Sequence, residues 1–168
     1  LFVFFVWLTM DKVGMGSSNL MPALRSPWFV PHVVSYMFAY AAMTAVTIVA
    51  VVLWIRSVKH EVTPVQMSLC DRLVRIGWAF MTLGLCMGAL WAKEAWGHYW
   101  SWDPKETWAA ITWLAYLVYI HYRQLPRQRV RLAHWMLIIS FVLLQMCWWG
   151  INYLPSAQGS SVHTYSLD

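Results

Sequence analysis

Long uncharged, apolar runs alternate with short segments that carry most of the charge. The run 32–55 contains no Asp, Glu, Lys or Arg and exceeds the roughly 20 helical residues that cross a hydrocarbon core about 30 Å thick. Residues 132–151 form a second run of sufficient length, whereas 76–92 and 107–122 are shorter and need a flanking turn to span. This pattern predicts an all-α membrane protein, a bundle of about four transmembrane helices joined by short loops.

The composition supports the same interpretation. Of the 168 residues, 60% are hydrophobic and 11% are charged, well below the roughly 25% charged residues of ordinary soluble domains. The chain begins with Leu, and residues 1–8 are apolar but too few to span and lack the features of a signal peptide. We therefore expect a piece of a longer chain, in which 1–25 end an upstream segment and outer loop and 26–168 form a four-helix domain.

Basic residues are concentrated in two connections, 56–75 and 122–131, which hold eight of the twelve Lys and Arg. By the positive-inside rule, both connections are predicted to be cytoplasmic or stromal. The segment before the first helix, the loop after the second and the tail after the fourth then share the periplasmic or lumenal face. Because topology accounts for the basic residues, the pI near 9.3 does not indicate nucleic-acid binding.

The same topology divides the histidines between the two faces. Each histidine alone is more typical of an interfacial polar residue than of a metal ligand, but histidines that share a face are candidates for joint ligation. Three are expected on the outer face, His32, His98 and His163, and three on the inner face, His60, His121 and His134.

The loop at 91–108 and its helix junctions are unusually rich in tryptophan, and Gly97 permits close backbone approach there. An aromatic belt explains single Trp residues at a membrane boundary, but this density favours an apolar shelf for a planar ligand. Haem fits, because its macrocycle stacks on aromatic rings, neutral imidazoles ligate its iron and its propionates need cations. The candidate propionate partners on this face are Lys93, Lys105 and Arg25.

The segment 103–106, Asp-Pro-Lys-Glu, has the pattern of a helix start. Asp103 can act as N-cap, Pro104 suits the first helical position, and Glu106 can reach back to the N-cap backbone as in a capping box. A catalytic acid–base pair formed by Asp103 and Glu106 is the alternative. The three scattered cysteines form no Cys-x-x-Cys pair, which argues against a thiol oxidoreductase or covalently attached haem on this chain.

The segment 96–108, Trp-Gly-His-Tyr-Trp-Ser-Trp-Asp-Pro-Lys-Glu-Thr-Trp, closely resembles the tryptophan-rich "WWD" signature of haem-handling membrane proteins in cytochrome c maturation. Its ending is most similar to the CcsA (ResC) branch of that family. The segments 26–33 and 150–154, and the run 162–165 near the C-terminus, resemble the same branch in the same order.

This resemblance implies that His32 and His163 are the axial ligands of a non-covalently held haem b on the outer face. It also implies an inner haem site near the end of the helix that follows the loop, for which His121 is the candidate and His134 the competing choice. The expected haem-contacting residues of the loop and its surroundings are Lys93, Trp96, Gly97, Tyr99, Trp100, Trp102, Asp103, Lys105 and Trp108.

The resemblance further implies a function in haem transport and ligation. The haem would be presented, reduced, to the two thiols of an apocytochrome c Cys-x-x-Cys-His motif, as part of a holocytochrome c synthase (haem lyase). A CcsB/ResB-type membrane partner is expected, in a bacterial inner membrane or a thylakoid. The alternatives are a haem-transfer protein that loads a haem chaperone, and a non-haem membrane module that binds a partner or forms a transporter core.

Overall fold

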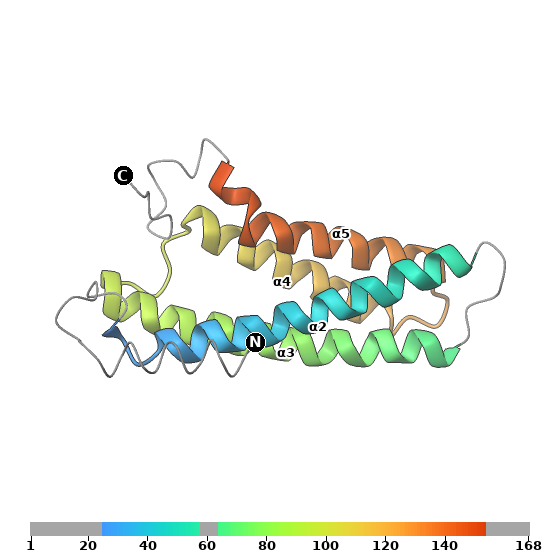
Figure 1. The fold of residues 1–168 in the computed structure, drawn as a ribbon, viewed down its shortest axis with the longest axis horizontal. Coiled ribbons are helices and arrows are strands. Elements are labelled where there is room, and N and C mark those ends of the chain that lie inside the picture. The colour runs from blue at the N-terminus through green and yellow to red at the C-terminus, as the bar shows by residue number, and fades with distance from the viewer. Residues whose placement is uncertain (1–24, 58–63, 154–168) are drawn as a thin grey trace.

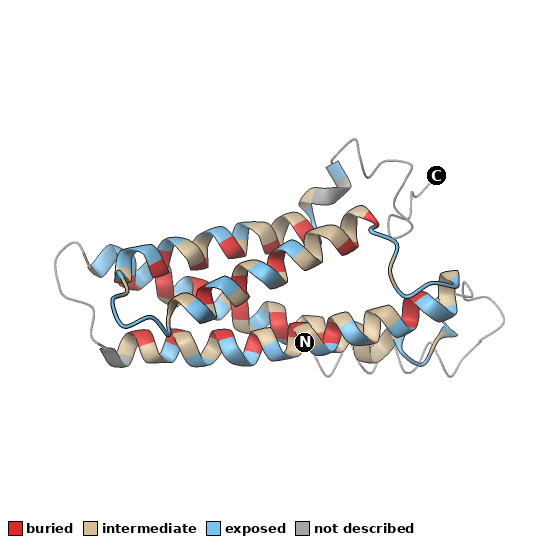
Figure 2. Cartoon of the chain, turned by 180° about the vertical axis from the view of Figure 1, so that it is seen from behind, coloured by how far each residue is buried: buried red, intermediate tan, exposed pale blue. Residues whose placement is uncertain are grey.

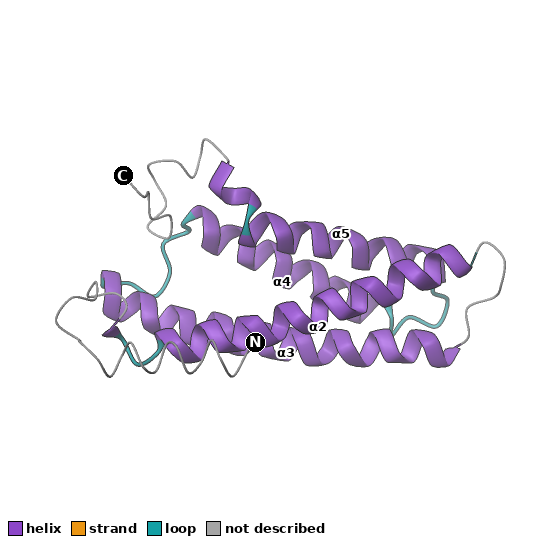
Figure 3. Cartoon of the chain, viewed as in Figure 1, coloured by secondary structure: helices purple, strands orange, loops and turns teal. Residues whose placement is uncertain are grey.

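The computed structural model describes residues 25–57 and 64–153. Within these ranges the regular structure is helical, without a β-strand (Figure 3). The helices are α2 (Phe29–Arg56), α3 (Pro64–Trp96), α4 (Pro104–Tyr122) and α5 (Val130–Trp148), and a 3-10 turn, η2 (Gly150–Tyr153), follows α5. The all-α prediction is confirmed.

Three of these helices, α2, α3 and α5, are long and apolar enough to cross a membrane. Between 22% and 33% of the residues in their apolar windows are buried, so most side chains there face outward, where a bilayer can solvate them. The remaining helix, α4, has 19 residues and carries Lys105 and Glu106 in its first turn. Helices of this length with exposed apolar faces are those of an integral membrane protein.

Helix boundaries differ from the prediction at several places. Most of the predicted connection 56–75 is helical, because α3 begins at Pro64, and Arg72 and Arg75 therefore lie on α3. Hydropathy marks where an apolar run begins, whereas a helix can start several polar residues earlier, here with a proline that suits the first position. The uncharged run 107–122 is extended at its start to Pro104, as the capping pattern at 103–106 predicted, whereas α5 ends at 148 rather than 151.

The helices are arranged as two antiparallel pairs (Figure 1). Most contacts of α2 are with α3, most contacts of α4 are with α5, and α2 also packs against α5. The start of α2, the loop 97–103 and the end of α5 lie at one end of the bundle, and the loop 123–129 lies at the other (Figure 1). Segments that are far apart in the sequence therefore meet at the end that holds the tryptophan-rich loop.

The buried core follows the faces that the four helices turn toward one another (Figure 2). Its largest fully buried side chains include Met43 of α2, Met81 of α3, Tyr116 and Tyr119 of α4 and Leu137 of α5. Large apolar side chains such as those of Ile48 and Val142 remain more than half exposed, as expected for helices that face lipid.

Two glycines of α3 let α2 approach closely. A Cβ at Gly84 would lie 2.8 Å from ring atoms of Tyr36, and a Cβ at Gly88 would lie 2.7 Å from the imidazole of His32. Small residues four positions apart commonly allow such close helix contacts in membranes. Here they make room for ring-bearing side chains at the start of α2.

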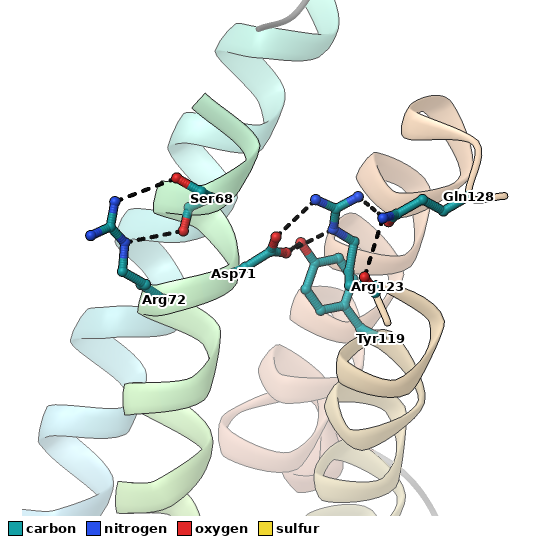
Figure 4. A network of polar contacts seen from close by, with 6 residues as sticks. All are labelled: Ser68, Asp71, Arg72, Tyr119, Arg123 and Gln128. Carbon is teal, nitrogen blue, oxygen red and sulfur yellow. Dashed lines mark hydrogen bonds and ion pairs between the residues drawn. The ribbon is translucent and has the colours of Figure 1, made fainter. Parts of the chain in front are cut away.

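At the opposite end of the bundle, one carboxylate connects α3 to α4 (Figure 4). Asp71 Oδ1 accepts hydrogen bonds from Arg123 Nε and the Tyr119 hydroxyl, and Oδ2 accepts one from Arg123 Nη2, all at 2.8 Å. Arg123 also donates to the side chain of Gln128, which donates back to the Arg123 carbonyl. The hydrogen bonds to Asp71 hold the pKa of the Arg123 guanidinium above its ordinary value.

Candidate functional site

A cavity of about 510 Å³ lies between the two helix pairs, at the end that carries the loop 97–103. It is lined by residues of all four helices and of the loop, and most of these are apolar or aromatic. Among the described residues, the charged side chains that line it are Lys105 and Glu106. Its volume lies within the about 300–1,000 Å³ that is typical of small-molecule and cofactor sites.

One wall of the cavity is a row of rings on α2. His32, Tyr36 and Tyr40 are four residues apart, so they lie on one face of the helix, and all three line the cavity. The ring centroids of His32 and Tyr36 are 5.0 Å apart, and those of Tyr36 and Tyr40 are 5.7 Å apart. This row places an imidazole close to the mouth of an aromatic cavity.

The imidazole of His32 is oriented by its neighbours on α3. Its Nδ1 lies 2.8 Å from the carbonyl oxygen of Gly84, and its ring stacks on Trp91, with centroids 5.7 Å apart and planes at 25°. A carbonyl can only accept, so Nδ1 carries the proton and donates, and in the neutral imidazole Nε2 is then the unprotonated nitrogen. Metal-binding histidines commonly have this arrangement, in which the other ring nitrogen donates to a fixed acceptor.

The tryptophans of the loop occupy different positions around the cavity. Trp96 packs edge-on against Trp91, with centroids 4.8 Å apart, while Trp100 and Tyr99 line the cavity. Trp102 is 70% exposed and is not among the residues that line it. The two positive φ angles of the described chain also occur here, 87° at Gly97 and 59° at Trp102.

The start of α4 is a complete capping box, which confirms the capping prediction. Asp103 Oδ1 accepts a hydrogen bond from the Lys105 backbone N–H at 2.8 Å, and Glu106 Oε2 accepts one from the Asp103 backbone N–H at 3.2 Å. Both carboxyl side chains are largely buried and are held by backbone donors. The geometry therefore assigns Asp103 and Glu106 to helix capping and gives the acid–base interpretation no support.

The three candidate cations lie in different surroundings. Lys105 lines the cavity, whereas Lys93 is exposed, donates through Nζ to the Gly97 carbonyl at 2.8 Å and lies 5.4 Å from the centre of the Tyr99 ring. Arg25 is exposed at the edge of the described chain. Of the three, only Lys105 is placed where it can contact an occupant of the cavity.

The other histidines of the described chain lie away from this cavity. His98 is exposed in the loop. His121 is exposed at the far end of α4, with Nδ1 2.8 Å from the Leu117 carbonyl, whereas His134 is fully buried and neither of its ring nitrogens has a hydrogen-bond partner. His163 lies outside the described residues. Trp108 is partly buried on α4 and is not among the residues that line the cavity.

Several residues that form the walls of the cavity are not among the candidates that the sequence suggests. Tyr36 and Tyr40 share the face of His32, and their four-residue spacing could have revealed them. Cys147 and Trp148 of α5 also line the cavity, and the Trp148 ring stacks on Tyr40 with centroids 5.4 Å apart. No sequence pattern links these two residues to α2, because their contact depends on how the helix pairs pack.

The residues that line the cavity are compatible with a haem. It combines an oriented imidazole from His32, flat aromatic walls and one lining cation, Lys105. In the ranges 25–57 and 64–153 no group of three His, Cys, Asp or Glu side chains could hold a bare metal ion. A haem iron needs only axial ligands from the protein, and His32 could supply one of them.

The sequence is similar to a known protein family and to several named proteins. A family model described as "Cytochrome C assembly protein" matches residues 1–157. "Cytochrome c biogenesis protein CcsA" of Chlamydomonas reinhardtii is 32% identical over 171 residues, which cover 97% of this chain and 47% of the relative. Proteins of the same name from Prochlorococcus marinus strains MIT 9312 and MIT 9301 are 38% and 35% identical, covering 89% and 98% of this chain and 57% and 62% of theirs. The chain thus spans about half the length of the curated relatives it matches.

Proposed function

The chain belongs to the cytochrome C assembly protein family, and we propose that it holds haem b in this cavity and presents it for covalent attachment to apocytochrome c. The observation that supports this proposal best is the orientation of His32. Its Nδ1–H donates to the Gly84 carbonyl, so Nε2 is the nitrogen suited to ligate iron beside the cavity. A merely structural histidine would not require an aromatic cavity of this volume next to it.

In the proposed complex, His32 supplies one axial ligand and His163, from the C-terminal tail, supplies the other. Trp91 and Trp100 form part of the aromatic walls that exclude water from the macrocycle, and Lys105 is the cation available to a propionate. Trp96 supports Trp91 from behind, so it acts on the ligand through a second ring. Asp103 contributes by fixing the start of α4, not by contact with the ligand.

The bound haem supplies two vinyl groups, and the apocytochrome supplies two thiols that add across them to form thioether bonds. In each addition a C–S bond forms and the thiol hydrogen is transferred to the other vinyl carbon, so atoms balance without a further reagent. The contribution of this chain is to orient the haem and to hold one edge accessible to the apocytochrome. The histidine of the Cys-x-x-Cys-His motif displaces one axial ligand as the apocytochrome binds.

The complete reaction is proposed for a larger assembly, because the chain spans about half of its relatives. That assembly includes a CcsB/ResB-type membrane partner and lies in a bacterial inner membrane or a thylakoid. We place the loop 97–103 on the periplasmic or lumenal side, since Arg72 and Arg75 in the first half of α3 and the basic residues of the loop 123–129 lie toward the other end of the bundle.

We also propose an inner haem site, with His121 as its ligand in preference to His134. The imidazole of His121 is exposed and lies in an open depression, where Nδ1 faces the Leu117 carbonyl. The imidazole of His134 is fully buried, so a macrocycle could reach it only after the packed helices around it separated.

Absorption spectra of protein purified from haem-replete membranes test the outer site. We expect the parent chain to show a low-spin bis-histidine spectrum and His32→Ala to lose it, with added imidazole restoring it by filling the vacant axial position. His98→Ala is the matched control, because His98 is also on the loop side but does not line the cavity. An unchanged low-spin spectrum in His32→Ala would refute the ligand assignment, and no haem in the parent would favour a partner-binding module.

A further inference from the structure

The loop holds two tryptophans, two residues apart, in opposite surroundings. Trp100 lines the cavity, whereas Trp102 is 70% exposed, and their rings are nearly perpendicular at 88° with centroids 5.7 Å apart. In an extended segment, residues i and i+2 point to the same side. The left-handed φ of 59° at Trp102 breaks that rule, and it is the only positive φ of a non-glycine residue in the described chain.

One buried carboxylate oxygen explains this conformation. Glu106 Oε2 accepts hydrogen bonds from the backbone N–H groups of Ser101 and Asp103, at 2.8 and 3.2 Å, and from the Ser101 hydroxyl at 3.4 Å. These backbone donors flank Trp102 and converge on one anion. Convergent N–H groups around a left-handed residue form the concave anion site known as a nest.

The contacts with Ser101 exceed what helix capping requires. A capping box needs only the bond from Glu106 to the N-cap backbone, here that of Asp103. The additional hydrogen bonds connect the Glu106 carboxylate to Ser101, two residues before the N-cap, so that the bonded residues lie on both sides of Trp102, the residue with positive φ. Glu106 also lines the cavity, so the same side chain contacts the loop and faces the proposed ligand.

We propose that Glu106 is a positioning residue whose carboxylate fills a backbone nest and thereby directs Trp100 into the cavity and Trp102 outward. For its effect on haem this inference rests on the proposed function, but the conformational part does not. Without the anion, the hydrogen bonds from the Ser101 and Asp103 backbone are lost, and the bond from the Thr107 hydroxyl to the Trp102 carbonyl, at 3.2 Å, remains. That one bond does not hold a bulky residue in the left-handed conformation, so the segment relaxes to ordinary backbone angles. Both rings then change position together.

Fluorine NMR of haem-free protein labelled with 5-fluorotryptophan tests the conformational part. Replacing Trp100 or Trp102 by Phe assigns the two resonances. We expect Glu106→Gln, which keeps the shape and removes the charge, to shift both, while Trp78 and Trp113, hydrogen-bonded deeper between α3 and α4, keep their positions. Glu94→Gln is the control, because Glu94 binds Ser26 and does not line the cavity. Unshifted Trp100 and Trp102 resonances in Glu106→Gln would overturn the proposal.

Two further measurements separate this role from a general loss of fold. Glycine tolerates positive φ, so adding Trp102→Gly to Glu106→Gln should return the Trp100 resonance to its position in Trp102→Gly alone, which is the reference because the neighbouring ring is absent from both. If it stays displaced, the nest is not the cause. If Glu106→Gln does not fold, hydrogen exchange of the parent decides: slow exchange at the Ser101 and Asp103 amides supports the nest, and rapid exchange at both overturns it.

Haem retention tests the consequence for the ligand. We expect a several-fold loss of retained haem in Glu106→Gln and parent-level retention in Glu94→Gln. Shifted tryptophans with unchanged retention would overturn the link between this loop geometry and the ligand. A parent that binds no haem would refute the proposed function and leave the NMR result on the nest intact.

Discussion

Removal of the Asp71 carboxylate should weaken the attachment of α3 to α4 (Figure 4). In Asp71→Ala, Arg123 loses both hydrogen bonds of its bidentate pair and the Tyr119 hydroxyl loses its acceptor. Removing one partner of a buried ion pair costs about 3–5 kcal/mol, because the other charge stays behind uncompensated. The side chains of Arg123 and Asp71 are 13% and 12% exposed, so partial hydration and Gln128 offset some of this loss. We expect a loss of about 2–3 kcal/mol in the free energy of unfolding, roughly 30- to 150-fold in the equilibrium constant.

Unfolding in mixed micelles with a rising mole fraction of dodecyl sulfate, followed by far-ultraviolet circular dichroism, measures this loss. Arg123→Met and the double variant complete a double-mutant cycle, in which the coupling should exceed about 1 kcal/mol because neither single variant leaves both groups satisfied. Arg72→Met is the control, since within the described residues the side chain of Arg72 bonds only to Ser68 of its own helix. This substitution should change stability by less than about 0.5 kcal/mol. Equal losses in Asp71→Ala and Arg72→Met, or no coupling, would refute the reasoning.

Two other outcomes follow from the described contacts. Gly88→Ala should displace the facing imidazole of His32, whose atoms lie 2.7 Å from the added Cβ, and should lower haem retention several-fold. The control is Gly77→Ala, whose added Cβ meets the flexible side chain of Met43 and should reduce stability without a matching loss of haem. Equal haem loss in both variants would contradict this prediction. A group with a raised pKa loses its contribution only as pH rises through the folded value. The hydrogen bonds to Asp71 raise the pKa of Arg123 above its ordinary value, which already lies far above neutral pH. The ion-pair coupling should therefore stay constant from about pH 6 to about pH 9 in the same cycle, and a decline across that range would show that another group titrates.

The features that could be predicted from the sequence depend on residues that are close together along the chain. The number of helices followed from apolar runs, and the start of α4 followed from the spacing of Asp103 and Glu106, because a capping box involves only residues three apart. The start of α3 at Pro64 was missed, since its first turns are polar and hydropathy cannot distinguish them from a loop. Likewise, the sequence offered His32 as a candidate ligand but gave no sign of the Gly84 carbonyl that orients it.

The parts that escaped prediction depend on packing between distant segments. Cys147 and Trp148 reach the cavity only because α5 packs against α2. The pattern placed His121 and His134 on the same face of the membrane, yet one is exposed and the other fully buried, since helix rotation and not sequence position decides burial. The double role of Glu106 was also hidden, because its bond to Ser101 depends on the left-handed angle at residue 102.

The two ends of the bundle differ in how they join the helix pairs, and this difference bears on the proposed function. Near the loop 123–129, Asp71 and Arg123 tie α3 to α4 with directional bonds. At the other end, a cavity of about 510 Å³ separates the pairs, so their packing there contributes less dispersion attraction than a filled core would. A polar connection at one end lets the fold tolerate an open aromatic cavity at the other. An occupant that binds only the folded chain would add the missing contacts and stabilise the bundle, so loading and stability are coupled by mass action.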